Sequence, residues 1–344
     1  MGASHARAYH RMPEFAIAGL VSRGEASRRK LNSELGSGYE EFSSYEEALA
    51  QVKPDAVCIS TYSDTHADYA VTAMEAGAHV FLEKPVADTL ADAERVIAAA
   101  RRTKRALVVG YILQVHPTWT KFTEIARTLG TPLVMRMNLN QQSAGEAWGT
   151  HKQLLRTTSP IVDCGVHYVD VMCRMTGARP VRVNGIGARL ADDITAGQIN
   201  YGHLQVTFDD GSVGWYEAGW GPMMSETAFF VKDVIGPKGS VSIVAQRATR
   251  SGRSADIESH TSVEALRIHH AALAADGSFA RGDEVVGVDD EPDHDELCRR
   301  EQQVFLEAIR GGVDLGPHWQ SALDSLRIVL AADQSYREGR TVTL

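Results

Sequence analysis

The first third of the chain alternates short apolar segments with segments of helical periodicity, and this pattern constrains the fold most strongly. Thr65–Gly77 and Asp88–Lys104 carry apolar residues at helical spacing, and Gly77 is a natural C-terminal stop. Asp88–Lys104 also has acids near its start and bases near its end, as the helix dipole favours. Short buried strands that alternate with helices predict a parallel sheet with right-handed crossovers. The apolar runs with the length of strands are Ala16–Ser22, Ala56–Ser60, His79–Leu82 and Ala106–Tyr111.

The pattern changes after about residue 112. Helices are predicted over Thr118–Leu129 and Pro160–Thr176, and the Asp209-Asp210-Gly211 sequence predicts a hairpin turn. Residues 248–293 are polar and acidic and are interpreted as loops, before closing helices over Leu297–Arg310 and Trp319–Arg337. The strand-like stretches are Val181–Ala188, Gly202–Phe208, Ser212–Gly219, Thr227–Ile235 and Ser240–Val244.

These patterns predict an α/β chain of two domains. Residues 1–112 are expected to form the parallel-sheet domain. Residues 113–344 are expected to form an α+β domain with a large, open, mostly antiparallel sheet.

Composition excludes several classes of protein. The 344 residues include 35 Lys and Arg against 44 Asp and Glu, a formal charge of −9. That excess of acid argues against binding to nucleic acid or to an anionic membrane. The 4 cysteines form no C-x-x-C pair, which is typical of free thiols in a reducing cytoplasm. Because there is no apolar signal core and no run approaches the roughly 20 residues that span a bilayer, a cytoplasmic protein is expected.

Two sequence pieces fall at carboxyl ends of predicted parallel strands, where such sheets bind ligands. The first, Thr61–His66, is either a helix start capped by Ser63 or Asp64, or a backbone platform beside a cofactor. The second, Glu83-Lys84-Pro85, carries Lys84 into the same crevice, and the bond before Pro85 is a candidate for the cis form. The alternative for Lys84 is a solvated loop lysine.

A third piece, Asp163-Cys164-Gly165-Val166-His167, places an acid and a histidine four residues apart on one helix face. Gly165 leaves room for close approach, and the acid could orient the imidazole for proton transfer. An ordinary surface pair and a metal site are the alternatives. No third ligand has matching spacing nearby, so no metal is predicted.

Four other candidates are less informative. His269-His270 and Asp293-His294-Asp295 lie in polar stretches and are interpreted as solvated loops. Trp215 and Trp220 are more typical of packing than of a sugar platform.

Taken in order, these pieces resemble the glucose–fructose oxidoreductase / inositol dehydrogenase / rhizopine-catabolism (Gfo/Idh/MocA) family over nearly the whole chain. The resemblance implies a Rossmann domain that holds a nicotinamide cofactor, and a larger domain whose open sheet builds homodimers or homotetramers. It implies that Lys84, Asp163 and His167 are the catalytic groups. The matching segments are Thr72–Pro85, Gly110-Tyr111 with His116-Pro117, Asp163–Asp170, Ile235-Gly236 with Gly239-Ser240, and Ala331–Leu344.

The resemblance also implies the ligand-binding residues. Where an Asp often ends the second strand, this chain has Ser22-Arg23, which accepts a 2′-phosphate, so NADP is favoured over NAD. The family's Thr-Pro-Asn and its frequent Arg are replaced here by Thr61–Ser63 and Gln114. The implied cofactor-binding residues are Gly2, Ser22, Arg23, Thr61, Tyr62, Ser63, His66, Glu83 and Lys84. The implied substrate-binding residues are Lys84, Tyr111, Gln114, His116, Trp148, Asp163 and His167, with Trp220 as a further candidate.

The expected activity is hydride transfer between nicotinamide and a hydroxyl-bearing carbon of a sugar, cyclitol or related polyol. Two alternatives are an NAD-dependent glycoside-cleaving enzyme of the same fold and a non-catalytic nucleotide-sensing protein. The first strand and leading glycines of the family are absent before Gly2. A start codon assigned too far downstream is the expected cause. If the chain is complete, a sheet without its middle strand and a weakened pyrophosphate site are expected.

Overall fold

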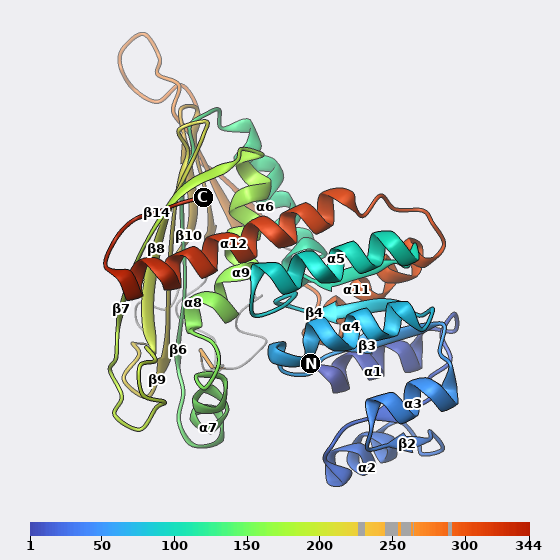
Figure 1. The fold of residues 1–344 in the computed structure, drawn as a ribbon. Helices are drawn as coiled ribbons and strands as arrows, with labels where there is room; N and C mark the ends of the chain where they lie inside the picture. Colours follow the sequence, from blue (N-terminus) through green and yellow to red (C-terminus); the bar gives the residue numbers. More distant parts are fainter. Residues whose placement is uncertain (226–230, 245–253, 256–262, 264, 288–290) are drawn as a thin grey trace. The chain divides into compact units, whose positions relative to one another are not determined.

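The computed structural model describes residues 1–225, 231–244, 254–255, 263, 265–287 and 291–344 (Figure 1). It divides into two compact units. Unit 1 comprises Met1–Ile112 and Pro292–Gln320, and unit 2 comprises Leu113–Glu291 and Ser321–Leu344. The chain therefore crosses from one unit to the other near residues 112, 291 and 320.

Unit 1 contains the predicted parallel strands, and its described strands form two separate sheets. One sheet pairs β1 (Leu20–Val21) with β2 (Glu41–Phe42). The other has the order β3, β4, β5, with bounds Ala56–Ile59, His79–Glu83 and Leu107–Gly110. The parallel Rossmann-like sheet is confirmed, and β1 and β3 lie in different sheets. The helices are α1 (Gly2–Arg11), α2 (Glu25–Glu34), α3 (Tyr45–Val52), α4 (His66–Glu75), α5 (Leu90–Thr103) and α11 (His294–Ile309).

The sequence pattern predicted α4 and α5 close to their observed bounds but assigned the N-cap of α4 to the wrong residues. Gly77 has a positive φ of 96° just beyond the end of α4, as its role as a stop requires. Ser63 and Asp64 do not cap α4. They begin the short 3-10 helix η1 (Ser63–Thr65), which moves the N-cap of α4 to Thr65. The apolar run Ala16–Ser22 forms only the two-residue strand β1.

The segment Pro292–Gln320, which the sequence analysis assigned to the second domain, belongs to unit 1. The reason is hydrophobic: Phe305 of α11 is buried against Phe81 of β4, with ring centroids 6.0 Å apart. Asp293 is the N-cap of α11 and accepts a hydrogen bond from the Glu296 backbone. The interpretation of Asp293-His294-Asp295 as a solvated loop is therefore wrong, because these residues start a helix.

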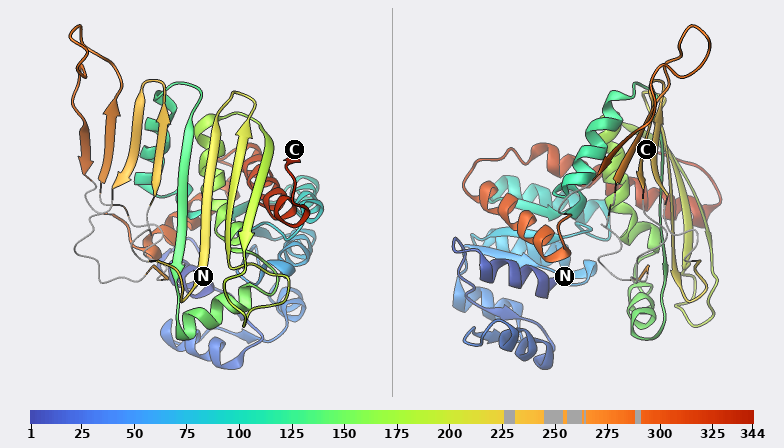
Figure 2. Two further views of the ribbon diagram at one scale, coloured as in Figure 1. Left: turned by 90° about the vertical axis from the view of Figure 1, so that its left-hand side faces the viewer. Right: turned by 180° about the vertical axis from the view of Figure 1, so that it is seen from behind.

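Unit 2 is built on a nine-stranded sheet of order β13-β12-β11-β10-β6-β9-β8-β7-β14. Neighbouring strands are antiparallel except β6 and β9, which are parallel. Figure 2 shows helices against one face of this sheet and an open opposite face. The strands are β6 (Val134–Gln142), β7 (Pro180–Ala188), β8 (Tyr201–Phe208), β9 (Val213–Gly221), β10 (Lys232–Gly236), β11 (Gly239–Val244), β12 (Ala265–His270), β13 (Glu284–Gly287) and β14 (Val342–Thr343). The helices are η2 (Ile112–Gln114), α6 (Pro117–Thr128), α7 (Gly145–Leu154), α8 (Pro160–Asp163), α9 (Gly165–Thr176) and α12 (Gly316–Glu338).

Comparison with the predicted elements of unit 2 shows several differences, among them the unpredicted helix α7. The helix predicted over Pro160–Thr176 is divided at Cys164 into α8 and α9. Part of the predicted loop region 248–293 forms β12 and β13, so His269-His270 lies on a strand. The strand β6 was not predicted at all. The hairpin turn at 209–211 is confirmed, and the first part of the predicted strand Thr227–Ile235 lies outside the described residues.

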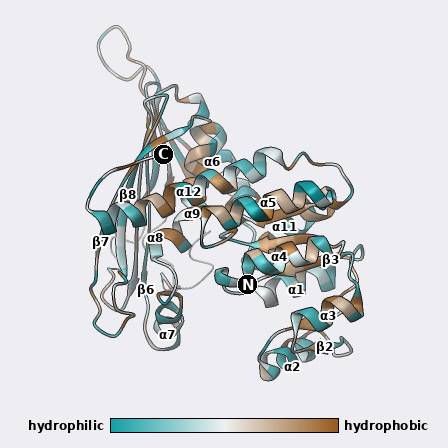
Figure 3. Cartoon of the chain, in the orientation of Figure 1, coloured by the Kyte–Doolittle hydropathy of each residue, from teal (hydrophilic) through white to brown (hydrophobic). Residues whose placement is uncertain are grey.

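None of the described helices combines the length and the apolar character needed to cross a membrane. Figure 3 shows hydrophilic residues along surface helices such as α2 and α5. Their polar sides therefore face water.

The contact between α12 and β7 leads to the first prediction. A Cβ added at Gly185 would overlap the carbonyl oxygen of Ala332 on α12. Gly185→Ala is therefore expected to displace α12 and lower the free energy of unfolding by about 1–3 kcal/mol in urea titrations. Gly149→Ala on α7 is the control, because its Cβ would meet no atom within 4 Å. Equal unfolding midpoints for the two variants would contradict the packing described.

Candidate functional site

Adjacent parallel strands bring the predicted cofactor-binding turns of unit 1 to one sheet edge. Ile59 at the end of β3 pairs with Leu82 of β4, so the turns that follow the two strands are neighbours. His66 joins these turns: its Nδ1 lies 2.7 Å from the Pro85 carbonyl oxygen, and its Nε2 lies 3.1 Å from that of Thr61. Burial lowers the pKa of His66. Because burial favours the neutral imidazole, which carries one N–H, His66 donates to one of these carbonyl oxygens and contacts the other. The predicted cofactor residue His66 is thus a buried link between the two turns.

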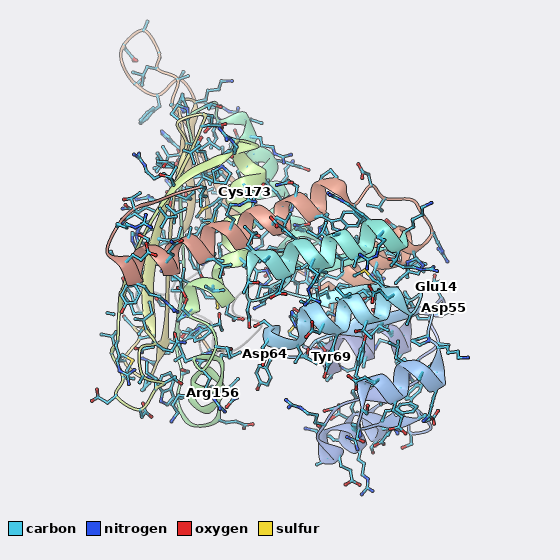
Figure 4. All side chains as sticks on the ribbon, viewed as in Figure 1. Glu14, Asp55, Asp64, Tyr69, Arg156 and Cys173 are labelled. Atoms are coloured by element: carbon cyan, nitrogen blue, oxygen red, sulfur yellow. The ribbon has the colours of Figure 1, made fainter. Side chains whose placement is uncertain are left out.

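The turn after β3 presents a locally fixed backbone. Thr61 Oγ1 lies 2.7 Å from Thr65 Oγ1, which donates to the Tyr62 carbonyl oxygen at 2.9 Å. Tyr62 is 47% exposed, and Asp64 is labelled in the same turn in Figure 4. The arrangement suits a surface that a planar ligand covers.

The end of β1 carries more positive charge than sequence reasoning recognised. Ser22 is half-buried and Arg23 is exposed, as a contact with an adenosine 2′-phosphate would need. Arg28 of α2, which the sequence analysis missed, donates to the Ser22 carbonyl oxygen. Its Nε lies 3.7 Å from a carboxylate oxygen of Glu41. The spacing of Arg23 and Arg28 in the sequence does not predict that the Arg28 side chain contacts Ser22.

Gly2, the first residue of α1, lies close to Ser60, which follows β3. A Cβ at this position would lie 2.6 Å from the Ser60 Oγ. A larger residue here would require the Ser60 hydroxyl to move, so glycine suits this approach of the helix start to the strand end. The first amides of a helix have no intrahelical partner and favour a phosphate, so this part of unit 1 fits a nucleotide cofactor.

Lys84 follows directly after β4 and is half-buried, and the peptide bond from Lys84 to Pro85 is cis, as predicted. Its neighbour Glu83 is buried and accepts the backbone N–H of Lys84 at 3.2 Å. The second carboxylate oxygen of Glu83 lies 2.7 Å from Nε2 of His5, a buried residue of α1 that sequence reasoning missed.

A cluster with metal-ligand chemistry lies beside this pair. His5, Cys298 and Glu301 are buried, and their ligand atoms lie within 4.8 Å of one another. Both ring nitrogens of His5 already have hydrogen-bond partners, in Glu83 and Gln302. Burial raises the pKa of the Cys298 thiol and of the Glu301 carboxyl. His5 is therefore already hydrogen-bonded, and Cys298 and Glu301 are favoured in their neutral forms, so the three residues are poor ligands for a metal ion.

In unit 2, Asp163 closes α8 and His167 lies in the first turn of α9. The linking Cys164 has helical angles, φ −86° and ψ −35°, and its Sγ lies 3.7 Å from an Asp163 carboxylate oxygen. Gly165 packs closely within unit 2, because a Cβ there would lie 3.2 Å from Tyr216 and Val329. Both Asp163 and His167 are half-buried, and their joint catalytic role stays a prediction.

An aromatic and polar group lies near Asp163. The ring of His151 stacks on Trp220 with centroids 4.7 Å apart, and its Nδ1 lies 2.8 Å from the Ser143 hydroxyl. Burial lowers the pKa of His151 to about 4, against the opposing charge of Asp163. Trp220 also donates from Nε1 to Gln141 at 2.7 Å. One face of Trp220 is therefore covered by His151, which favours the packing interpretation of that tryptophan.

Three of the predicted substrate residues, His116, Tyr111 and Trp148, contact other residues of their own unit. His116 is fully buried and caps α6, with Nδ1 accepting the Thr118 N–H at 3.2 Å and Nε2 lying 3.4 Å from Glu291. Tyr111 is buried beside the His318 ring at 6.2 Å. Trp148 of α7 lies beneath the Lys152 ammonium at 5.7 Å. Substrate contact by these residues stays a prediction.

Asp170 of α9, which the sequence analysis also missed, is hydrogen-bonded to two residues that lie next to points where the chain passes between units. Gln114 donates from Nε2 to one carboxyl oxygen of Asp170 at 2.9 Å, and the Ser321 hydroxyl donates to the other. Gln114 and Ser321 each lie beside a point where the chain changes unit. Burial raises the pKa of Asp170, which is fully enclosed.

Lys232 is a further buried ionisable group that was missed. Its Nζ donates to the Asn138 carbonyl oxygen at 2.6 Å and lies 5.3 Å above the ring of Tyr168. Burial lowers the pKa of Lys232 to about 7, so this amine changes charge near neutrality. The only feature of the sequence that could have indicated a buried Lys232 is the position of this lysine at the start of a strand with apolar residues.

Comparison with known proteins adds independent findings. Residues 1–111 match the family model "Oxidoreductase family, NAD-binding Rossmann fold", and residues 126–242 match "GFO/IDH/MocA C-terminal domain". Over 312 residues the chain is 26% identical to scyllo-inositol 2-dehydrogenase (NAD(+)) of Bacillus subtilis, covering 87% of this chain and 80% of that protein.

A second curated relative matches over a shorter region. UDP-N-acetylglucosamine 3-dehydrogenase of Acidithiobacillus ferrooxidans is 28% identical over 193 residues, which is 56% of each chain. The match thus spans little more than half of that relative. The crystal structure of GenD2, from gentamicin A biosynthesis and in complex with NAD, superposes with a TM-score of 0.75 at 19% identity, covering 100% of this chain and 93% of that one. This likeness shows a shared fold.

The buried carboxyl of Asp170 leads to a prediction for stability. Because burial raises its pKa, the folded protein keeps this proton at pH values where the unfolded chain has released it. The contribution of Asp170 to stability is therefore complete below about pH 4 and falls as pH rises towards its folded pKa. Asp170→Asn cannot titrate, so its free energy of unfolding relative to wild type should improve by about 1–3 kcal/mol between pH 4 and pH 8.

Urea unfolding at several pH values measures this difference. Asp192→Asn, at an exposed position, controls for the loss of a carboxylate. Parallel stability profiles for wild type and Asp170→Asn would refute the assignment.

Proposed function

The chain belongs to the Gfo/Idh/MocA family of NAD-binding oxidoreductases, and from that premise we propose that it transfers a hydride between nicotinamide C4 and a hydroxyl-bearing carbon of a sugar, cyclitol or related polyol. The observation that carries the proposal is the placement of Lys84 at the ligand-binding edge of the parallel sheet. The presence of Asp163 and His167 at the α8–α9 junction agrees with it. Curated relatives named as dehydrogenases of a cyclitol and of a UDP-sugar support this substrate class.

The residues of unit 1 would hold the cofactor. The start of α1 at Gly2 suits the pyrophosphate, and the turn Thr61–Ser63 offers a fixed backbone beside it. Ser22 and Arg23 would receive a 2′-phosphate, with Arg28 close to the Ser22 carbonyl, so NADP remains the favoured form. The cofactor, when bound, supplies or accepts the hydride.

The side chains proposed as catalytic have complementary tasks. Lys84 would hydrogen-bond the reacting oxygen and stabilise negative charge that develops on it. His167 would accept the hydroxyl proton during oxidation and return it during reduction, while Asp163 orients the ring. In this proposal Lys84 is the cation, His167 is the base, and Asp163 is the hydrogen-bond acceptor that orients the base.

We also propose that the open sheet face joins copies of the chain into homodimers or homotetramers. Val134 and Ile186 are 39% and 55% exposed on that face, and the polar residues Arg182 and Gln205 line the same hollow as Val134. Apolar residues among polar ones are typical of such contacts.

The proposed roles predict a large loss of turnover. Lys84→Met and His167→Asn should each lower kcat by at least about 100-fold, because each removes a group that acts in the transition state. The assay is absorbance of reduced nicotinamide over a panel of sugars and cyclitols, with NAD and NADP in parallel. Lys30→Met, a change at an exposed lysine of α2, is the matched control.

Retention of turnover within a few-fold in either variant would show that the assignment is wrong. Release of a sugar from glycosides without net reduction of the cofactor would indicate the glycoside-cleaving alternative. Tight nucleotide binding without turnover of any polyol would indicate a nucleotide sensor.

The cofactor preference is tested by binding alone. Ser22→Asp should weaken NADPH binding by at least about 10-fold and leave NADH binding within a few-fold, since a carboxylate repels the 2′-phosphate. Fluorescence titration of the reduced cofactors gives both dissociation constants. Tighter binding of NADH than of NADPH by the wild-type protein would reverse the proposed preference.

A further inference from the structure

A chain of hydrogen bonds in unit 1 ends at the backbone of Lys84. It starts at the Tyr9 hydroxyl, which donates to Oε1 of Gln302. The Gln302 amide nitrogen lies 2.9 Å from Nδ1 of His5, and His5 Nε2 lies 2.7 Å from Glu83 Oε1. The other oxygen of Glu83 accepts the Lys84 N–H at 3.2 Å. Three elements far apart in sequence, α1, α11 and β4, therefore meet at one imidazole.

The direction of every bond in this chain follows from the chemistry of the groups. An amide nitrogen only donates, so Nδ1 of His5 accepts from Gln302 and carries no proton. The proton of the imidazole is then on Nε2, which donates to the Glu83 carboxylate. Gln302 is held in this orientation because its oxygen receives the Tyr9 hydroxyl.

Burial makes these bonds consequential. His5 and Gln302 are fully enclosed and Glu83 is 6% exposed, so water does not replace a lost partner. The neighbouring Glu301 is also enclosed, and burial together with the charge of Glu83 raises the pKa of Glu301. Glu301 is therefore favoured in its neutral form.

We propose that His5 is a positioning residue for Lys84. By donating to one oxygen of Glu83, it aims the other oxygen at the Lys84 N–H and fixes the backbone from which the Lys84 side chain projects. His5 acts through Glu83 and need not touch substrate or cofactor. Its role in turnover rests on the proposed function of Lys84, whereas its role in holding the Lys84 backbone does not.

Three variants separate this role from general stability. His5→Phe keeps a ring but removes both hydrogen bonds, and His5→Gln retains a donor for Glu83 and an acceptor for Gln302. Gln302→Leu keeps the His5 ring and removes the group that fixes its proton on Nε2, so it carries the test if His5→Phe does not fold. His10→Phe is the matched control, since His10 is an exposed residue of the same helix.

The first measurement does not depend on activity. Amide hydrogen exchange at Lys84 should speed up by at least about 10-fold in His5→Phe, because the Glu83 carboxylate is no longer aimed at that N–H. Exchange in the strands of unit 2 should stay unchanged. His5→Gln and His10→Phe should exchange as the wild-type protein does, and Gln302→Leu should lie between them and His5→Phe. Unchanged exchange at Lys84 in both His5→Phe and Gln302→Leu would overturn the proposal.

The second measurement uses a substrate that the wild-type protein turns over. His5→Phe should lower kcat by about 10- to 100-fold while KM stays within a few-fold, since a displaced catalytic group weakens the transition state more than binding. His5→Gln should restore most of kcat. Faster exchange at Lys84 with undiminished kcat would refute the positioning role. If the wild-type protein turns over no polyol, the proposed function fails, and the exchange data alone decide the structural claim.

Discussion

Unit 1 depends on the packing of α11 against its three-stranded sheet. Phe305 of that helix closes the core over Phe81 and Val108, and burial of one such side chain contributes about 1.5–3 kcal/mol. The next turn back along α11 places Gln302 against His5. The apolar contact thus fixes the helix, and the helix in turn supplies the polar partner that sets the histidine. A segment from the end of the sequence completes a domain that begins at its start.

Periodicity was sufficient for the buried parallel strands and for much of the open sheet, but not for β6, β12 and β13. A strand such as β4 is enclosed on both faces, and its central residues Val80, Phe81 and Leu82 form a continuous apolar run, which makes it recognisable. The strand β6 was missed although Arg136, Asn138 and Asn140 alternate with apolar residues along it, a pattern that predicts a strand with one face on the core. The hairpin of β12 and β13 was taken for loops because it is polar. Its cross-strand pairs, such as Arg267 with Asp283, are visible only once the strands are aligned.

For the candidate site, sequence position identified residues that follow strands and missed residues that act through distant partners. Lys84 and Thr61 could be predicted because a parallel sheet exposes whatever follows its strands. His5 gave no local signal, since its partners Glu83 and Gln302 lie 78 and 297 positions away. Gln114 was expected to face substrate, yet its amide is bonded to Asp170, 56 positions along the chain. Hydrogen bonds of this range have no periodic signature.

The departure from the family pattern at Thr61–Ser63 has a physical explanation in the role of His66. The side chains of Thr61 and Thr65 hold part of this turn. The imidazole of His66 adds contacts with the Thr61 and Pro85 carbonyl oxygens, which are backbone groups that every residue type provides. Tyr62, half exposed at the centre of the turn, is then free of a structural duty. Two buried histidines, His5 below Glu83 and His66 beside Pro85, thus hold the two ends of the Glu83–Pro85 segment and confine Lys84 between them.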